Sequence, residues 1–317
     1  MKESTVSQVT ISSEEAGQRL DNYLIRWAKG VPKSHIYRII RSGEVRVNKK
    51  RIDVTHRLAE GEVLRIPPIR VATPSTAQEK TAASLYQSQK VASQIPVIYE
   101  DDALLIVDKP SGLAVHGGSG VSLGLIEALR QARPELKFLE LVHRLDRDTS
   151  GILMLAKKRS ALVALHEQIR SGQIDKRYIL LAHGALPRSD KPVPLKYPLL
   201  KYLLPNGERR VKVDPDGQLS HTIIKILGPA RQGRCFVAQA QLKTGRTHQI
   251  RVHLQHFGHF LVGDEKYGDP ALDKQVGGKR LMLHAYRLIF VHPKTGEKMV
   301  VESPWPVGFE VDEEQHA

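Results

Sequence analysis

Two stretches near the N-terminus carry apolar residues at the three- and four-residue spacing of an amphipathic helix. They are Leu20, Tyr23, Leu24 and Trp27, and then Ile36, Ile39 and Ile40. Residues 13–15 are a polar start signal for the first stretch, while Pro32 precedes the second and Gly43 follows it. Because helix starts favour Ser and Pro and helix ends favour Gly, we predict two consecutive helices here.

The next segments alternate between apolar and polar positions, which is the two-residue period of a β-strand. Residues 44–48 and 61–66 show this alternation, and Asn48–Lys50 is typical of a turn. Residues 1–12 are polar and lie at the chain end, so we expect them to be flexible. The pattern therefore predicts a small α/β module over residues 13–68.

Residues 69–93 are rich in Gln, Lys and Ala and have little periodic apolar signal, which predicts a flexible or partly helical linker. Further on, the pattern predicts strands at 103–107, 152–156, 178–182, 222–227 and 235–242, with helices at 160–169 and 249–257. Irregularly interleaved strands with few helices are typical of an α+β fold. We therefore expect residues 94–317 to form a second domain around a mixed, largely antiparallel sheet.

The composition is that of an ordinary globular protein. Of the 317 residues, 41% are hydrophobic, and no apolar run approaches the ~20 residues that a membrane-spanning helix needs. A chain of this length suits two domains. The N-terminus has no basic region followed by an apolar stretch, so we predict no secretory signal and expect a cytoplasmic location. Cys235 has no partner cysteine and lies in an alternating run, which predicts a position in a strand core.

The chain is strongly basic, with a formal net charge of +14. A polyanionic partner is the simplest reason for such an excess, and nucleic acid is favoured over an anionic membrane surface. Residues 26–65 hold eleven Lys or Arg and four Asp or Glu, a net charge of +7. The predicted basic patch therefore lies on the N-terminal module.

The densest chemistry lies in residues 143–151, which read His-Arg-Leu-Asp-Arg-Asp-Thr-Ser-Gly. So many polar groups between apolar segments are costly unless a function needs them. A solvated loop whose aspartates cap turns stays open as an alternative. A protein-kinase loop is excluded, because kinases have His-Arg-Asp without the intervening leucine and a Gly-rich loop upstream. Residues 117–120 are too short and wrongly placed for a phosphate-binding loop.

A second cluster, residues 243–254, leads from a strand into a helix and contains Arg246, His248 and Arg251. His248 and Arg251 are three residues apart on that helix, so they can face one site. The four histidines in residues 248–259 lack the spacing of a zinc site and have no Cys or acidic ligand among them, so we predict no metal. A phosphate-facing helix surface is the alternative interpretation of the arginines.

Together these clusters resemble the three ordered motifs of the RluA family of pseudouridine synthases. The motif residues are His143-Arg144-Leu145-Asp146 with Thr149-Ser150-Gly151, then Lys176-x-Tyr178, then Gly245-Arg246-Thr247-His248-Gln249-Ile250-Arg251-Val252-His253. Residues 107–116 are similar to an upstream segment of that family, and residues 18–68 resemble an S4 RNA-binding domain. The likeness covers nearly the whole chain, and no motif position departs from the family pattern.

The resemblance implies that residues 94–317 are a catalytic domain that isomerises uridine to pseudouridine in 23S RNA, the large-subunit ribosomal RNA of bacteria. Asp146 is then the catalytic carboxylate, as nucleophile or as base at C2′. Arg251 is its partner, because a guanidinium favours and orients an ionised carboxylate. Tyr178, by itself more typical of a core residue, would stack on the base. Asp148, the competing carboxylate, is assigned to a turn or an ion pair.

The resemblance also implies where RNA is bound. Flipping a base out of folded RNA costs about a few kcal/mol, and Arg144 beside Asp146 is expected to fill the gap. Further contacts are expected from Arg246 and His248, and in the S4-like domain from Lys33, Ser34, Arg38, Arg41, Lys49, Lys50 and Arg51.

The reaction gains and loses no atoms, so no cofactor is expected. The expected partner is 23S ribosomal RNA, with no membrane association, no obligatory protein partner and a monomeric state. Two functions of other classes remain as alternatives. One is a non-catalytic RNA-binding protein, which would have no use for an ionisable Asp146 between two arginines. The other is an RNA hydrolase or transferase with a metal at the histidine cluster.

Overall fold

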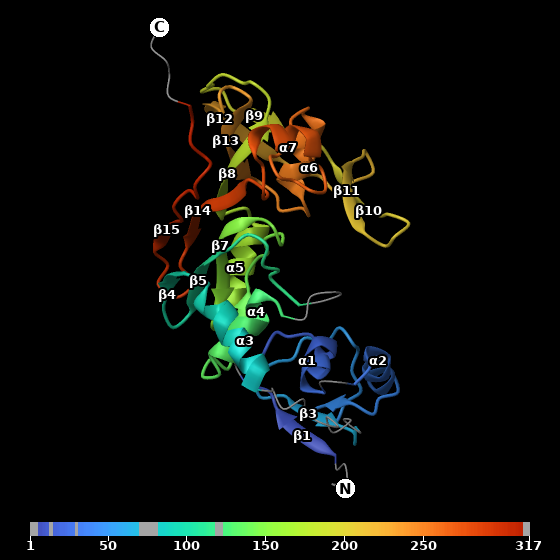
Figure 1. The fold of residues 1–317 in the computed structure, drawn as a ribbon. Coiled ribbons are helices and arrows are strands. Elements are labelled where there is room, and N and C mark those ends of the chain that lie inside the picture. The colour runs from blue at the N-terminus through green and yellow to red at the C-terminus, as the bar shows by residue number, and fades with distance from the viewer. Residues whose placement is uncertain (1–5, 13–14, 29–30, 70–81, 118–122, 313–317) are drawn as a thin grey trace. The chain divides into compact units, whose positions relative to one another are not determined.

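The computed structural model describes residues 6–12, 15–28, 31–69, 82–117 and 123–312. The chain forms two compact units, residues 1–87 and residues 88–317 (Figure 1). Each unit has a hydrophobic core of its own, as expected for a chain of this length.

The first unit is a small α/β fold. In chain order its elements are β1 (Ser7–Thr10), α1 (Leu20–Trp27), α2 (Lys33–Arg41), β2 (Arg46–Val47) and β3 (Val63–Ile66). The strands pair antiparallel in the order β1-β3-β2. Both predicted apolar stripes supply its buried core: Leu20, Tyr23 and Leu24 from α1, and Ile36, Ile39 and Ile40 from α2.

Two predictions near the N-terminus are wrong. Residues 7–10, predicted to be flexible, form β1 and pair with β3, because their alternation lets Val9 pack against the core. Helix α1 begins at Leu20 and not near residue 13, because Gly17 has a φ of +76° and residues 15–17 form a turn. Residues 1–5 and 13–14 of these predictions lie outside the described residues.

One ten-stranded sheet organises the second unit. Its strands are β4 (Val97–Glu100), β5 (Leu104–Lys109), β6 (Glu140–Leu141), β7 (Ser150–Ala156), β8 (Asp175–His183), β9 (Val193–Leu195), β12 (Thr222–Ala230), β13 (Cys235–Leu242), β14 (Leu283–Val291) and β15 (Lys298–Glu302). They run in the order β4-β5-β7-β14-β8-β13-β12-β9, with β6 on β7 and β15 on β14. Strands β7 and β14 are parallel and the other pairs are antiparallel, so the predicted mixed, largely antiparallel sheet is confirmed.

The remaining helices are α3 (Ala82–Ser93), which spans the boundary between the units, α4 (Leu125–Ala132), α5 (Arg159–Arg170), α6 (Gln249–His256) and α7 (Pro270–Val276). No helix in the described ranges is long and apolar enough to cross a membrane. The sequence located α5, α6 and five of the sheet strands, and Cys235 is buried in β13 as predicted.

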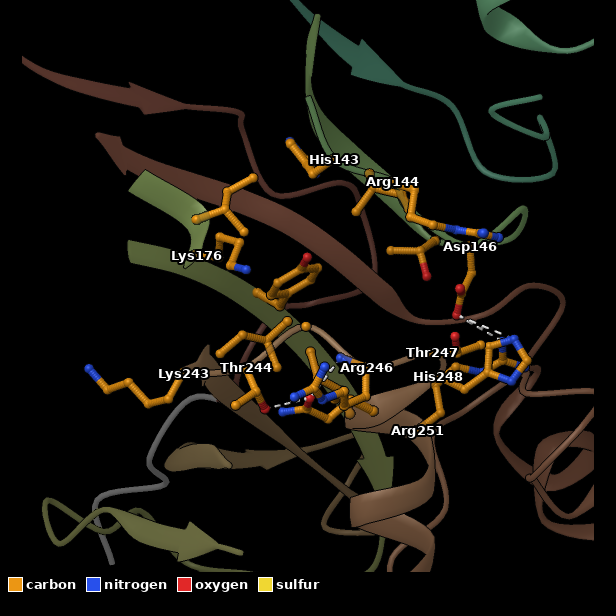
Figure 2. Close-up of a pocket in the computed structure, with 18 of the residues that line it drawn as sticks. His143, Arg144, Asp146, Lys176, Lys243, Thr244, Arg246, Thr247, His248 and Arg251 are labelled. Atoms are coloured by element: carbon orange, nitrogen blue, oxygen red, sulfur yellow. Dashed lines mark hydrogen bonds and ion pairs between the residues drawn. The ribbon is translucent and has the colours of Figure 1, made fainter. Parts of the chain in front are cut away.

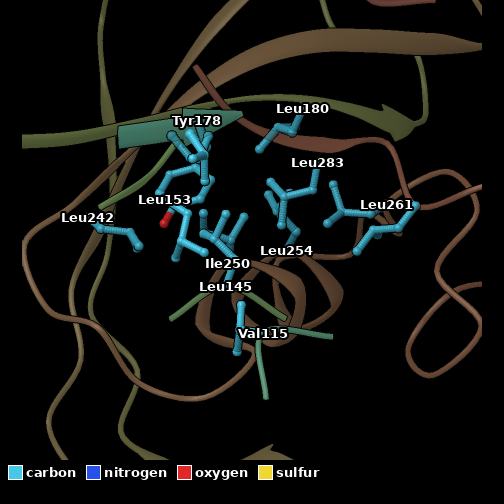
Figure 3. Close-up of a cluster of buried hydrophobic side chains, with 14 of the residues drawn as sticks. Val115, Leu145, Leu153, Tyr178, Leu180, Leu242, Ile250, Leu254, Leu261 and Leu283 are labelled. Atoms are coloured by element: carbon cyan, nitrogen blue, oxygen red, sulfur yellow. The ribbon is translucent and has the colours of Figure 1, made fainter. Parts of the chain in front are cut away.

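Helix α6 is fixed against the centre of the sheet. Leu153 of β7, Leu180 of β8 and Leu283 of β14 belong to one buried cluster with Ile250 and Leu254 of α6 (Figure 3). Such close-packed apolar contacts leave a helix little freedom to shift. The packing therefore sets the direction of the polar side chains that α6 carries.

A short hairpin outside the main sheet is also attached to α6. Its strands are β10 (Leu199–Leu203) and β11 (Arg209–Val213), which pair only with each other among the named strands of the described chain. Val211 of β11 packs in a small buried cluster with Val252 of α6 and Tyr267. The sequence did not predict this hairpin, because each strand is only five residues long and Lys or Arg residues interrupt the apolar positions.

Gly151 is needed where β7 begins beside β14. Its φ is +110°, and a Cβ at this position would lie 2.3 Å from the carbonyl oxygen of Ala285. Gly172, after α5, has a φ of +72°, but an added Cβ there would meet nothing within 4 Å. An alanine at residue 172 would therefore add backbone strain alone, whereas an alanine at residue 151 would add both strain and a steric clash.

We predict that Gly151→Ala lowers the free energy of unfolding of the second unit by about 3 kcal/mol or more, because the clash with β14 adds to the strain. Gly172→Ala should cost only the strain of a left-handed alanine, about 1–2 kcal/mol. Scanning calorimetry of both variants measures the difference. Equal shifts in melting temperature would contradict the clash.

Candidate active site

A pocket of about 670 Å³ brings the three sequence motifs of the second unit together (Figure 2). Its size lies within the range of about 300–1,000 Å³ that is typical of small-ligand sites. Among the described residues that line it there is one carboxylate, Asp146, and six cations: Arg144, Arg170, Lys176, Lys243, Arg246 and Arg251. This excess of positive charge favours an anionic ligand.

A buried lysine ties down the loop that carries Asp146. Lys109, at the end of β5, is 0% exposed, and its Nζ donates hydrogen bonds of 2.8 to 2.9 Å to the carbonyl oxygens of Pro110, Leu113 and Arg147. Burial lowers the pKa of Lys109 to about 8. At neutral pH the amine therefore keeps the three protons that three carbonyl acceptors require.

Other contacts fix the rest of this loop. The Nε2 atom of His143 accepts a hydrogen bond of 3.1 Å from the backbone N–H of Met154 in β7. Burial lowers the pKa of His143 to about 3, so the imidazole stays neutral. Ser111 Oγ donates to the carbonyl oxygen of Asp148 at 2.6 Å. Leu145 is buried in the core, and the next residue, Asp146, lines the pocket.

Arg251 of α6 holds the carboxylate of Asp146. Its Nη1 donates to Oδ2 of Asp146 at 3.2 Å, while Nε and Nη2 donate to Oδ2 and Oδ1 of Asp264 at 2.8 and 2.6 Å. The side chains of Arg251 and Asp264 are 3% and 1% exposed, whereas that of Asp146 is 21% exposed. The guanidinium of Arg251 thus connects the buried carboxylate of Asp264 with the carboxylate of Asp146, which lines the pocket.

The Arg251–Asp264 pair is ionised in spite of its burial. Burial would lower the pKa of Arg251, but the hydrogen bonds and charge of Asp264, and then Asp146, raise it above its ordinary value. Burial would likewise raise the pKa of Asp264, yet Arg251 and two backbone N–H groups hold it below its usual range. The opposite charges of Arg251 and Asp264 therefore cancel, and the pair supports Asp146 through the hydrogen bond from Arg251.

A second group approaches the same oxygen of Asp146. The Nε2 atom of His248 lies 3.9 Å from Oδ2, and its Nδ1 is hydrogen-bonded to the hydroxyl of Tyr267 at 2.7 Å. His248 caps the start of α6 with a left-handed φ of +53°. In the described part of the chain, Oδ1 of Asp146 has no hydrogen-bond partner, so it is left for a ligand.

Strand β8 supplies Tyr178 and Lys176 to the pocket. The two residues are two apart in a strand, so their side chains share one face of the sheet. Burial, and then the charge of Asp146, raises the pKa of Tyr178, which keeps the phenol protonated. Burial lowers the pKa of Lys176. Lys176 and Asp146 come from different sides of the pocket (Figure 2).

Five of the predicted site residues thus line one pocket with Asp146: Arg144, Tyr178, Arg246, His248 and Arg251. Arg144 is exposed, and within the described ranges its side chain has no hydrogen bond or ion pair. The Nε of Arg246 donates to the carbonyl oxygen of Leu219 at 3.2 Å. Asp148 forms an ion pair of 2.9 Å with the exposed Arg147, as the sequence predicted for a structural carboxylate.

The predicted RNA contacts of the first unit are all exposed. A hollow along α2 is lined by Ser34, Tyr37, Arg38, Arg41 and Ser42, and the guanidinium of Arg41 lies over the ring of Tyr37. Lys33 at the start of α2 and Lys49, Lys50 and Arg51 after β2 are exposed as well.

Three of the four histidines of residues 248–259 have hydrogen-bond partners in the described ranges, and the ring of the fourth, His256, packs edge-on against Tyr197. His253 is hydrogen-bonded to Thr222 Oγ1 at 2.9 Å and to the carbonyl oxygen of Tyr197 at 3.0 Å. His259 is hydrogen-bonded to the carbonyl oxygen of His183. Within the described ranges, no three His, Cys, Asp or Glu side chains are grouped so that they could hold a metal ion.

Sequence reasoning missed three residues that build the site. Asp264 and Tyr267 lie in a polar loop that reads like any surface turn, so no local signal distinguishes them. Lys109 could have been found, because a lysine at the end of a strand that begins with four buried apolar residues is a candidate for burial with hydrogen-bonded partners.

Comparison with known proteins gives consistent matches. The sequence profile described as RNA pseudouridylate synthase matches residues 103–256, and the S4 domain profile matches residues 18–64. Ribosomal large subunit pseudouridine synthase C of Yersinia pestis is 51% identical over 302 residues, covering 94% of this chain and 92% of that protein. The protein of the same name from Escherichia coli K12 is 50% identical over 309 residues, covering 96% and 94%. The structure of human RNA Pseudouridylate Synthase Domain Containing 4 shares the fold, with a TM-score of 0.57 and 24% identity over 71% of this chain and 94% of that chain.

We predict that Asp264→Asn lowers the free energy of unfolding by about 3 kcal/mol or more at neutral pH, because it removes the main partner of a buried guanidinium. The folded pKa of Asp264 is held below the ordinary value of 3.8, so its contribution is present above that pH and is lost as the pH falls further. The deficit of the variant should therefore shrink below about pH 4.

Urea unfolding of variant and parent across this pH range measures the effect. Asp148→Asn is the matched control, and it should cost less than about 1 kcal/mol because its partner is exposed. A deficit for Asp264→Asn that stays constant into acid would argue against the ion pair as its cause.

Proposed function

The chain belongs to the RNA pseudouridylate synthase family, and from that premise we propose that it isomerises specific uridines of 23S ribosomal RNA, with Asp146 as the catalytic carboxylate. The observation that supports this proposal best is the position of Asp146. It is the one carboxylate among the described lining residues of a cationic pocket, and Arg251 binds only one of its two oxygens. Relatives at about 50% identity carry the name ribosomal large subunit pseudouridine synthase C, which points to the same substrate.

The reaction breaks the N1–C1′ bond of uridine, turns the base and joins C5 to C1′. A carboxylate suits it because an ionised oxygen can trap an electron-poor sugar carbon or remove the C2′ proton. Asp146 presents Oδ1 for either role while Arg251 holds Oδ2. No atom is gained or lost, so the step calls for no cofactor.

The other pocket residues have matching tasks. Tyr178 is a protonated phenol whose ring forms part of the wall, so it can stack on the target base and donate a hydrogen bond. The side chain of Arg144 is exposed and makes no hydrogen bond or ion pair in the described ranges, so it is available to fill the gap that a flipped base leaves. Arg246 and Lys243 would bind flanking phosphates.

The first unit is proposed to anchor the RNA. We assign residues 13–68 to an S4-like RNA-binding domain, residues 69–93 to the connection and residues 94–317 to the catalytic domain. The exposed cations on α2 and after β2 give this domain its phosphate-binding surface. The enzyme is proposed to act as a monomer.

We predict that Asp146→Asn abolishes pseudouridine formation while RNA affinity stays within a few-fold of the parent, since one neutralised carboxylate removes the chemistry but no phosphate contact. Asp148→Asn, in the same loop, should be far milder. Mapping pseudouridine in 23S RNA from cells that lack the protein, complemented with parent or variant, tests both claims. Turnover by Asp146→Asn would refute the assignment, and unchanged 23S RNA in the deletion strain would refute the substrate.

We further predict that replacing Lys33, Arg38 and Arg41 by Gln flattens the log–log salt dependence of RNA binding by about two to three units, because each lost phosphate contact removes about 0.7–0.9. Turnover on a short hairpin at saturating concentration should not change. A triple Gln variant at Lys274, Lys294 and Lys298, which are also exposed, is the control with equal charge loss. Identical salt slopes for the two variants would show that α2 is not the anchor.

A further inference from the structure

Tyr267 lies behind the catalytic site and has two polar partners at its hydroxyl. The backbone N–H of Val211, in the hairpin strand β11, donates to Oη at 3.0 Å. The Nδ1 atom of His248 lies 2.7 Å from the same oxygen. The ring of Tyr267 is 6% exposed, and burial raises the pKa of Tyr267 to about 12. The hydroxyl therefore keeps its proton at neutral pH.

This arrangement selects one protonation form of His248. Val211 can only donate, so it occupies a lone pair of the Tyr267 oxygen and leaves the phenolic proton to be used elsewhere. Within the described ranges, Nδ1 of His248 is the one acceptor in reach of that proton. If Nδ1 carried a proton of its own, two hydrogens would face each other or the phenol would lack a partner. The satisfied form is a neutral imidazole with its proton on Nε2.

The surrounding charges are compatible with the neutral form. Burial lowers the pKa of His248; the charges of Asp146 and Asp264 oppose this shift, and those of Arg251 and Lys266 add to it. The backbone offers a second sign of constraint. His248 has a φ of +53° in front of α6, a conformation that costs energy for a residue with a Cβ. Strain of this kind persists where the side chain is needed in one direction.

Tyr267 is itself held by the frame of the site. Its backbone N–H donates to Oδ1 of Asp264 at 3.1 Å, and its ring lies 5.1 Å from the guanidinium carbon of Arg251. Arg251 also donates to Asp146, and Asp264 in turn holds Arg251. Movement of Tyr267 relative to Asp146 is therefore opposed by a buried ion pair.

We propose that Tyr267 is a positioning residue which fixes His248 as the Nε2–H tautomer, and that this N–H is the second donor, beside Arg251, to Oδ2 of Asp146 once RNA fills the pocket. The inference rests on the proposed role of Asp146. The Nε2–Oδ2 distance of 3.9 Å is longer than a hydrogen bond, and such contacts often tighten only when substrate is bound.

Two donors on one oxygen have a chemical consequence. With Oδ2 occupied by Arg251 and His248, only Oδ1 of Asp146 can reach the sugar, so the direction of attack or of proton removal is fixed. The donors also stabilise the negative charge on the carboxylate when it separates from the sugar carbon. Loss of the second donor should therefore reduce kcat and leave binding of RNA nearly unchanged.

The tautomer can be observed directly in the full-length protein. Long-range proton–nitrogen NMR spectra distinguish protonated from unprotonated imidazole nitrogens, and His248→Gln identifies the signals of His248 by their loss. We expect Nε2–H in the parent and a shift of the proton toward Nδ1 in Tyr267→Phe. Tyr286→Phe removes a comparable phenol hydrogen bond, 2.8 Å to Gln239, outside the pocket, and should leave the His248 signals in place.

Kinetics on an RNA substrate complete the test. Tyr267→Phe should lower kcat by about ten- to a hundredfold, the loss expected for a hydrogen bond to a charged group, with KM within about twofold. His248→Gln keeps an amide N–H at the reach of Nε2 and should retain most of the turnover that His248→Leu loses. His248→Gln and His248→Leu have the same backbone strain and leave Tyr267 intact. Comparison of their kcat values therefore tests the proposal even if Tyr267→Phe folds poorly.

Several results would overturn the proposal. These are a proton on Nδ1 in the parent, an unchanged tautomer and kcat in Tyr267→Phe, or equal kcat for His248→Gln and His248→Leu. If the parent forms no pseudouridine in any RNA, the proposed function fails, and the NMR measurement still decides whether Tyr267 orients His248.

Discussion

The architecture of the site depends on the guanidinium group of Arg251. Two of its nitrogens are committed to Asp264 in the sealed interior, and the third reaches Asp146 at the pocket. A buried charge of this kind is tolerated only with a well-placed counter-charge. The loop of Asp264, helix α6 and the loop of Asp146 therefore have to meet at fixed distances, although Asp146 is 105 residues from Arg251 in the sequence.

The rest of the second unit can be understood as support for this junction. The apolar face of α6 packs on β7, β8 and β14, so the helix cannot rotate Arg251 away. Lys109 and Ser111 donate hydrogen bonds to the backbone carbonyl oxygens of Arg147 and Asp148. These bonds fix the loop without using the carboxylate of Asp146. Structural hydrogen bonds thus go to backbone atoms, and the oxygen Oδ1 of Asp146 remains free within the described ranges for substrate.

Local patterns predicted much of this structure. Strands β5, β7, β8, β12 and β13 follow from apolar runs, and α5 and α6 from helical spacing. The pocket residues were singled out by the resemblance of three ordered motifs to a known family, because Tyr178 alone reads as a core residue. Asp264 and Tyr267 could not be predicted, because their importance arises from contacts with residues 13 and 19 positions away that no periodicity encodes. The strand β1 was not predicted, because its few apolar residues become partly buried only by pairing with β3, which the local pattern does not show.

The burial of Lys109 links the loop that carries Asp146 to the cooperativity of the whole domain. For the loop around Asp146 to open alone, three carbonyl groups would lose their donor and an ammonium group would stay behind in an apolar interior. Opening of this loop alone is therefore costly, which couples it to the rest of the domain. Heat should then disrupt the loop around Asp146 and the rest of the fold in one transition.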